Sequence, residues 1–537
     1  MVLLARLLPI LRWAPLLDRA TVQSDVAAGM TVAAMLVPQA MAYALLAGLP
    51  PEVGLYSATV PLLVYAVLGT SRQLAVGPVA ISSLLTAAGL GAVMVDGSPL
   101  GEGTKGYLAA AALLAVMVGV IRILLGMGRL GFLVNFLGQP VLVGFTAAAA
   151  LIIGFSQAKH LLGIDLPRTD GVVDTATEVL RHAGDARPVT LALGLSSLAA
   201  IQVLKRVAGR VPSALVVVIA STLAVKMFGL EKHGVTVVGQ IPSSLPGFAV
   251  PSFELGLVRG LADTALVIAI VGFMESIAVA KVYARRNNYE VDANAELVGL
   301  GAANVAAGFF GGYPVNGGLS RTAVNASAGA KTPFASIVTA VLVLVTIAFL
   351  TPLFTSLPNA ALAAIIISAV VGLIDVKEMV RIARVKRTDW VGVAAAFAGT
   401  LAFGVELGIV IGVAVMLATL AILRMKRPTQ RPVPARAVGS CGFQLSGTLS
   451  FVNASKVKRQ LLDRCSDSVG NQLRVDCSNL ADLDTTGAAA LCEVRSELAA
   501  RDVTLCLVGA RGPALQVMDR SGLLAESPAL EYERTSP

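Results

Sequence analysis

The 537-residue chain has little charge and few of the residues that enzymes use for catalysis or metal binding. Asp, Glu, Lys and Arg make up 14% of it, whereas a soluble globular protein carries about 25%. It has three histidines, and its five cysteines include no CxxC pair. It has no HExxH sequence, no Walker loop and no GxSxG in a strand–turn–helix context. We therefore expect neither a soluble protein nor an enzyme, and no metal site or other cofactor.

The cysteines and the net charge are both unevenly placed. The formal net charge is +9, which Lys and Arg in cytoplasmic loops explain without a nucleic-acid partner. Clustered cysteines without metal spacing are typical of reduced thiols in a cytosolic domain. All five lie near the C-terminus, at Cys441, Cys465, Cys477, Cys492 and Cys506.

Long apolar runs fill most of the chain. The composition is 56% hydrophobic and the mean hydropathy is +0.78. Runs long enough to cross a bilayer, together with three shorter or interrupted ones, predict about fourteen membrane spans. The clear runs lie near 26–47, 53–69, 107–126, 132–156, 188–204, 212–229, 261–282, 333–350, 358–374, 389–404 and 406–424, and the interrupted ones near 74–94, 294–310 and 317–329.

Basic clusters occur in alternate loops, and the loops between them are neutral or mixed in charge. By the positive-inside rule this pattern places both termini in the cytoplasm, as an even number of spans requires. We expect a multi-pass protein of a bacterial-type inner membrane. The basic clusters lie at Arg72, at Arg129, at Lys205–Arg210, at Lys281–Arg286 and at Lys377–Arg387.

Two interrupted segments occupy matching places in the two halves. One lies at 74–83 and the other at 317–325, seven spans later. Because seven is odd, the second half must be inserted upside down relative to the first. Paired broken helices in an inverted repeat indicate the substrate site of a transporter. We predict two repeats of seven spans, at about 20–230 and 250–425, within a transport domain of residues 1–427.

The interrupted segments carry the features of an anion site. Half-helices are expected to begin near Gly77-Pro78 and near Gly318, and each helix N-terminus carries about half a positive charge. Ser320 adds a hydroxyl and Arg321 a permanent positive charge. The alternative is a pair of ordinary kinks, since Gly and Pro are common in membrane helices.

Glu275 is the one acidic residue of an apolar run between Asp263 and Lys281. If it faces the same cavity as Arg321, its charge repels a bound anion, and protonation removes that repulsion. Anion and proton would then bind with positive coupling, which is the thermodynamic basis of symport. The alternative is a structural ion pair between Glu275 and Arg321.

The first span contains a proline followed by polar side chains. Pro38 removes a backbone hydrogen bond within it, and Gln39 and Tyr43 offer donors that could shape the wall of an anion site. The alternative is a kink with polar contacts between helices.

The composition changes abruptly in a basic, proline-containing linker at 428–437. Short alternating runs follow at Gly442–Leu449, Gln472–Asp476 and Val503–Val508, with helical patterns between them, so residues 438–537 are predicted to form a small cytoplasmic α/β domain.

Within this domain, Asp484, Thr485 and Thr486 precede a helix expected to begin near Gly487. Helix capping by a threonine is the favoured interpretation there, and phosphorylation the alternative.

These motifs together resemble the SulP sulfate permease family. The resemblance covers nearly the whole chain, and its one noted departure is Val53, where the family usually has an aromatic residue. The C-terminal domain resembles a STAS domain, with its signature loop at Leu483–Gly487. The segments that carry the resemblance to the permease are Val37–Ala44, Leu49–Ser57, Gly69–Arg72, Val76–Ala80 and Leu319–Asn325.

The resemblance implies an architecture and a set of site residues. It implies fourteen spans in an inverted repeat, core and gate domains, and a homodimer. It implies a carboxylate at Glu275 and, in the STAS domain, a hydroxyl at Thr486 that can be phosphorylated. A cytosolic partner for the STAS domain is a separate expectation. Val279, one turn after Glu275, cannot ligate sodium through its side chain. The anion site that it implies consists of Val76, Gly77, Pro78, Gly318, Leu319 and Ser320, with Arg321 behind them.

The sequence therefore predicts a secondary transporter that couples uptake of an oxyanion, sulfate above all, to protons by alternating access. The same fold could instead move a dicarboxylate or bicarbonate, or exchange anions. A membrane-anchored sensor or scaffold, signalling through the C-terminal domain, is the hypothesis from another class.

Overall fold

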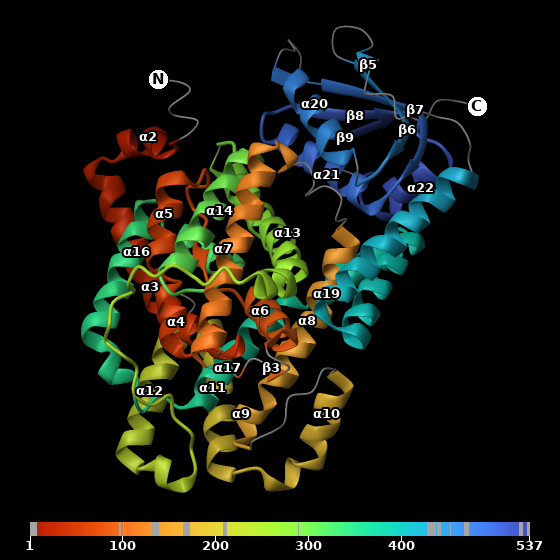
Figure 1. Cartoon of the computed structure of the whole chain (residues 1–537). Helices are drawn as coiled ribbons and strands as arrows, with labels where there is room; N and C mark the ends of the chain where they lie inside the picture. The colour runs from red at the N-terminus through yellow and green to blue at the C-terminus, as the bar shows by residue number, and fades with distance from the viewer. Residues whose placement is uncertain are drawn as a thin grey trace. The chain divides into compact units, whose positions relative to one another are not determined.

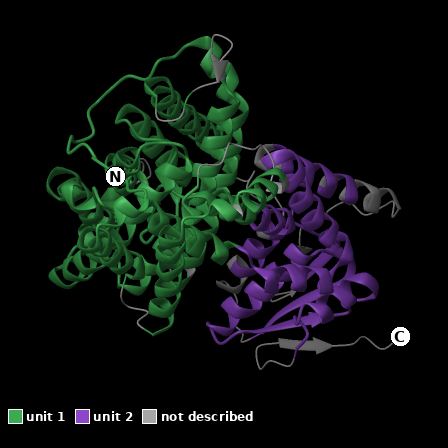
Figure 2. Cartoon of the chain, turned by 90° about the horizontal axis from the view of Figure 1, so that it is seen from below, with its two compact units in different colours: residues 1–134, 149–373 green, residues 135–148, 374–537 purple. Residues whose placement is uncertain are grey.

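The structure is a computed structural model (Figure 1). It divides the chain into two compact units, which Figure 2 shows in different colours. One unit holds residues 1–134 and 149–373, and the other holds 135–148 and 374–537. The residues that the structure describes are 8–95, 98–99, 101, 104–131, 139–164, 172–207, 212–287, 289–426, 436–437, 442–451, 453–466, 472–525 and 530–533.

The membrane part is helical. Among the described residues, eight helical stretches are long and apolar enough to cross a membrane, and α6 and α12 are shorter apolar helices. This is consistent with the prediction of about fourteen spans. The helices are α2 (Ile10–Trp13), α3 (Arg19–Leu46), α4 (Pro51–Tyr56), α5 (Val60–Leu68), α6 (Ala80–Ala92), α7 (Lys105–Met127), α8 (Gln139–Ser156), α9 (Ala158–Leu162), α10 (Val172–Arg181), α11 (Pro188–Val207), α12 (Ser213–Phe228), α13 (Leu255–Arg286), α14 (Ala293–Phe309), α15 (Leu319–Ser327), α16 (Phe334–Val345), α17 (Asn359–Val370), α18 (Val376–Val385) and α19 (Arg387–Lys426).

The two interrupted segments are broken as expected. Each is a two-residue strand followed by a short helix: β1 (Val76–Gly77) precedes α6, and β4 (Asn316–Gly317) precedes α15. The residue before α15 is Gly318, as predicted. In the first half, α6 begins at Ala80 rather than at Gly77-Pro78. Pro78 and Val79 precede the helix, and the backbone of Val79 is extended.

Helices α7 and α14 pack with their backbones almost in contact. A Cβ atom on Gly119 would lie 2.6 Å from the Gly301 carbonyl oxygen, and one on Gly308 would lie 2.4 Å from the Ala112 oxygen. A Cβ on Gly126 would lie 2.8 Å from the Asn294 oxygen. Residue numbers rise along α7 as they fall along α14, so the two helices are antiparallel. Their glycines recur every seven residues, which keeps them on one face of each helix.

The second unit contains α18, α19 and the C-terminal domain. The helical backbone of α19 is interrupted at Gly404, whose φ of 83° is left-handed. This break lies between the two predicted spans 389–404 and 406–424. Of the predicted linker 428–437, the structure describes only 436–437, which form β5.

The C-terminal domain is a five-stranded sheet with helices. The strands follow one another in chain order, with β5 antiparallel to β6 and the remaining neighbours parallel. Its core includes Phe443, Val475 and Leu507 from the sheet and Leu461 and Leu491 from the helices. The elements are β6 (Gly442–Leu449), α20 (Ala454–Ser466), β7 (Gln472–Leu483), α21 (Thr485–Ala499), β8 (Thr504–Val508), α22 (Gly512–Arg520) and β9 (Leu530–Glu533).

One local prediction in this domain is wrong. The sequence indicated a strand ending at Asp476, a loop, and a helix beginning near Gly487. Instead β7 continues to Leu483 and α21 begins at Thr485. The N-cap is Asp484, whose carboxylate accepts a 2.6 Å hydrogen bond from the Gly487 N–H, so neither threonine caps the helix.

Candidate anion site

The two broken segments meet as a pair of antiparallel strands. Val76 is opposite Gly317, and Gly77 is opposite Asn316. The Gly318 N–H donates to the Ala75 carbonyl at 3.0 Å, and the Ala75 N–H donates to the Thr322 hydroxyl at 3.1 Å. Because the strands are antiparallel, α6 and α15 leave the pair in opposite directions. Their N-termini therefore lie at the same place in the fold, as the inverted repeat predicted.

Both helix N-termini lack a side-chain cap. Val79 precedes α6 and Gly318 precedes α15, and neither supplies a side-chain hydrogen bond. The first N–H groups of a helix have no partner within the helix, and they attract anions. On α15 the first turn is accessible, since Leu319 is 51% exposed and Ser320 is also exposed, while Gly317 and Gly318 are buried.

Arg321 lies against both glycines of the site. A Cβ atom on Gly77 would be 3.4 Å from Arg321 Nη2, and one on Gly318 would be 2.9 Å from the same atom. The side chain is 2% exposed. Its Nη1 donates to the Pro78 carbonyl, whereas Nε and Nη2 are buried and have no partner. The Nε and Nη2 groups of Arg321 are thus held beside the β1–β4 pair without a hydrogen-bond acceptor.

Gln39 and Tyr43 are both buried on α3, which packs against α6 and α15. The amide oxygen of Gln39 has no hydrogen-bond partner. Tyr43 lies within electrostatic range of both Arg321 and Glu275. The helix runs through Pro38 without a break, so the proline removes one backbone hydrogen bond without dividing the span.

Glu275 lies on α13 beside the residue that ties this helix to the strand pair. The Ser276 hydroxyl donates to the Gly272 carbonyl at 2.6 Å and accepts from the Gly317 N–H at 2.9 Å. One carboxylate oxygen of Glu275 is buried without a partner. Glu275 and Arg321 attract one another electrostatically, but within the described part of the chain they form no ion pair.

Arg122 is a second buried cation that the sequence analysis missed. It lies on α7, is 0% exposed and is bonded to the Asn316 side chain of β4. Asn316 in turn donates to the Ser82 hydroxyl of α6. The sequence offered one signal, a lone arginine inside the apolar run at 107–126, which is as unusual at membrane depth as Arg321.

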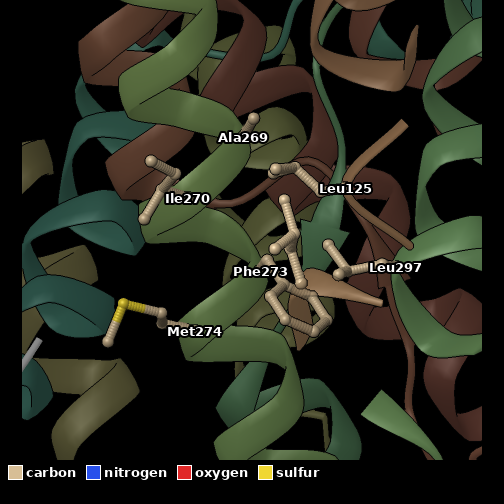
Figure 3. Close-up of a pocket in the computed structure, with 7 residues that line it drawn as sticks. Leu125, Ala269, Ile270, Phe273, Met274 and Leu297 are labelled. Carbon is tan, nitrogen blue, oxygen red and sulfur yellow. The ribbon is translucent and has the colours of Figure 1, made fainter. Parts of the chain in front are cut away.

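A small hollow lined by residues of α7, α13 and α14 is not a binding site for an ion. Figure 3 shows its apolar lining, which includes Leu125 of α7, Ala269 and Phe273 of α13, and Leu297 of α14. Its volume is about 10 Å³, which barely admits one water molecule. This hollow therefore does not compete with the strand pair and the two helix N-termini as the candidate site.

The first turn of α21 is bonded to the start of α19 within the second unit. Asp389 accepts hydrogen bonds from the Thr485 N–H at 2.8 Å and from its hydroxyl at 2.6 Å. Lys386 donates to both carboxylate oxygens of Asp482 at 2.9 Å. Thr485 is therefore engaged, whereas the hydroxyl oxygen of Thr486 is buried without a partner.

The carboxyl group of Asp484 predicts a pH dependence for this contact. Burial, and then the nearby charge of Asp389, raise the pKa of Asp484 from 3.8 to about 7. The folded state therefore holds the proton more tightly than the unfolded state, and stability falls as pH rises from about 4 to 7. We expect the opening free energy of α21 to be greater at pH 6 than at pH 8, by on the order of 1 kcal/mol.

Hydrogen exchange of the full-length protein, corrected for intrinsic rates, measures this difference on peptides from α21. In Asp389→Asn the pH dependence should be smaller, because one of the two causes of the raised pKa is removed while the side-chain oxygen can still accept from Thr485. Equal protection at the two pH values in the wild-type protein would contradict the assignment.

Comparison with known proteins identifies the class to which this fold and site belong. Residues 22–396 match the sulfate permease family, and residues 433–534 match the STAS domain. The chain belongs to the sulfate permease family. It is a multi-pass α-helical membrane protein that transports anions, with a C-terminal STAS domain, and it is not an enzyme.

Its relatives include transporters from plants, bacteria and mammals. The chain is 35% identical to the chloroplastic sulfate transporter 4.1 of Arabidopsis thaliana, over 93% of this chain and 77% of that protein. It is 34% identical to a probable sulfate transporter of Mycobacterium tuberculosis, over 94% and 92%. It is also 34% identical to the sodium-independent sulfate anion transporter of Bos taurus, over 96% and 89%.

Solved structures share the fold at low sequence identity. The murine Slc26a9 anion transporter, in an inward-facing state, has a TM-score of 0.73 at 23% identity and covers 99% of this chain and 93% of its own. The transmembrane domain of the cyanobacterial bicarbonate transporter BicA has a TM-score of 0.64 at 24% identity and covers 75% and 98%. These two structures support the fold alone.

Proposed function

We propose that the protein is a secondary transporter that couples uptake of sulfate to protons by alternating access. The observation that carries this proposal is the pair of unpartnered donors of Arg321, beside two uncapped helix N-termini. A tetrahedral oxyanion supplies several acceptors in a small volume and suits such a set of donors. The names of the relatives, which describe sulfate transporters, favour sulfate over a dicarboxylate or bicarbonate.

Each site residue has a role in this proposal. The first N–H groups of α6 and α15 and the Ser320 hydroxyl would bind the anion, with Val76, Gly77, Pro78, Gly318 and Leu319 forming the backbone around it. Arg321 would donate to the anion from behind, and Gln39 and Tyr43 would form the wall on α3. Glu275 would carry the proton. Its carboxylate is not paired with Arg321, so its charge would repel a bound anion, and protonation would remove that repulsion.

Replacing Glu275 tests the coupling. In proteoliposomes with an imposed pH gradient, we expect wild-type uptake of labelled sulfate to rise as the outside is acidified. In Glu275→Gln the pH gradient should no longer drive uptake, whereas exchange of external for internal sulfate should persist. A Glu275→Gln protein that is still driven by the pH gradient would remove the proton role.

Competitors in the same assay test the substrate. Displacement of labelled sulfate by fumarate or bicarbonate would keep the site but reassign the anion. No uptake of any anion would favour the sensor or scaffold hypothesis.

The proposal also covers the membrane, the oligomeric state and the role of the C-terminal domain. We infer a homodimer in a bacterial-type inner membrane, with both termini in the cytoplasm. The STAS domain would regulate turnover through a cytosolic partner. Thr486 would be the phosphorylation site, since Thr485 is engaged by Asp389. Its hydroxyl oxygen is buried, so a kinase would need the first turn of α21 to open.

A further inference from the structure

We propose that Arg122 acts as a charge-selectivity residue, whose field makes the site prefer a divalent to a monovalent anion. The inference rests on the proposed function and adds a residue to it. Arg122 does not contact the anion in this proposal. Its charge acts at a distance, from the far side of Asn316, the residue of β4 that faces Gly77 across the strand pair.

Arg122 is bonded entirely to neutral groups. Its Nε donates to the Ala269 carbonyl at 3.1 Å, and Nη2 donates to the Ile268 carbonyl at 3.0 Å. Nη1 donates to the Val315 carbonyl at 3.3 Å, and Nη2 also donates to the Asn316 side-chain oxygen. Among the described residues, no carboxylate lies within ion-pair distance of the guanidinium group. Its charge is therefore not cancelled locally.

The other buried carboxylates of the first unit are occupied elsewhere. Asp25 accepts from the Lys331 N–H and from the N–H and hydroxyl of Thr332. Glu296 accepts from the Tyr65 hydroxyl and from the N–H and hydroxyl of Thr70. Neither is bonded to Arg122 or Arg321, so within the part of the chain that the structure describes the two arginines and Glu275 are the charged side chains associated with the strand pair.

The charges associated with the site match a divalent anion when Glu275 is protonated. Arg122 and Arg321 then bring two positive charges, equal in magnitude to the charge of sulfate. Arg122 also holds β4 against α7 and α13 through four neutral acceptors, and its buried charge acts in addition to this structural role. Since the energy of an ion in a fixed field is proportional to its charge, Arg122 stabilises a divalent anion twice as much as a monovalent one.

The test compares divalent and monovalent anions in the same proteoliposomes. Labelled sulfate gives the half-saturating concentration, unlabelled selenate is the divalent competitor, and nitrate is the monovalent one. In Arg122→Gln, which keeps a donor for Asn316 but not the charge, we expect sulfate and selenate to weaken about tenfold and nitrate about threefold. The ratio follows because doubling the charge squares the fold-change.

Two further variants separate charge from structure. Arg122→Lys keeps the charge and should keep the wild-type preference, including where Arg122→Gln fails to fold. Arg129→Met, an exposed arginine on the segment after α7, makes the same change in net charge and should change nothing. An equal loss for all three anions in Arg122→Gln, or a lost preference in a folded Arg122→Lys, would overturn the inference. Failure of the wild-type protein to take up sulfate would overturn the proposed function and the inference with it.

Discussion

Arg321→Met is expected to lower sulfate uptake at least 100-fold. The variant removes two donors, Nε and Nη2, that are buried at the strand pair without a partner. A hydrogen bond to a charged group contributes about 1.5–3 kcal/mol, so losing two weakens binding by about 3 kcal/mol or more, which is a factor of roughly 100. Uptake of labelled sulfate into proteoliposomes, normalised to the amount of reconstituted protein, measures the loss.

Two control variants show whether the charge or the donors matter in this experiment. Arg321→Lys keeps the positive charge but not the fork of donors, so we expect an intermediate loss. Arg259→Met changes the net charge equally at an exposed position of α13, and should transport as the wild type does. Normal uptake by a folded Arg321→Met protein would show that the anion binds elsewhere.

Gly301→Leu is expected to destabilise the membrane domain by about 3 kcal/mol or more, because overpacking against backbone atoms cannot be relieved by a rotamer change. A Cβ at this position would lie 2.8 Å from the Gly119 carbonyl oxygen and 3.0 Å from the Ile123 nitrogen. The added side chain would have to force α14 away from α7. Thermal unfolding in detergent measures the effect as a lower midpoint temperature.

The matched control for this variant is Gly154→Leu in α8. A Cβ on Gly154 meets no atom within 4 Å, so the same substitution in another apolar helix should leave the midpoint nearly unchanged. A Gly301→Leu protein as stable as the wild type would mean that α7 and α14 are not packed through their glycines.

The sequence predicted those parts of the site that are local in the chain. Gly318 and Pro78 carry backbone constraints that depend on nothing distant, so the breaks before α15 and α6 could be found from them. The start of α6 was displaced from Gly77-Pro78 to Ala80, because pairing with β4 holds β1 extended. The local conformational preferences of Gly77 and Pro78 do not predict the pairing of β1 with β4.

The parts that could not be predicted depend on contacts between distant residues. Arg122 was an arginine in an apolar run, and only the fold brings it to Asn316, 194 positions away. The Asp389–Thr485 hydrogen bonds join residues 96 positions apart, and nothing near either residue signals the other. The glycines of α7 and α14 recur every seven residues, so a search for that spacing could have indicated their packing.

The strand pair β1–β4 has a consequence for how new substrate preferences could arise. Backbone pairing joins it at Val76–Gly317 and Gly77–Asn316, and the side chains of Thr322, Ser276 and Arg122 support it, whereas Leu319 and Ser320 take no part in these hydrogen bonds. Exposed side chains such as Leu319 and Ser320 can therefore vary while the backbone geometry stays fixed. A screen limited to these two positions should yield folded proteins with altered anion preference, and is the natural starting point for redesigning this transporter.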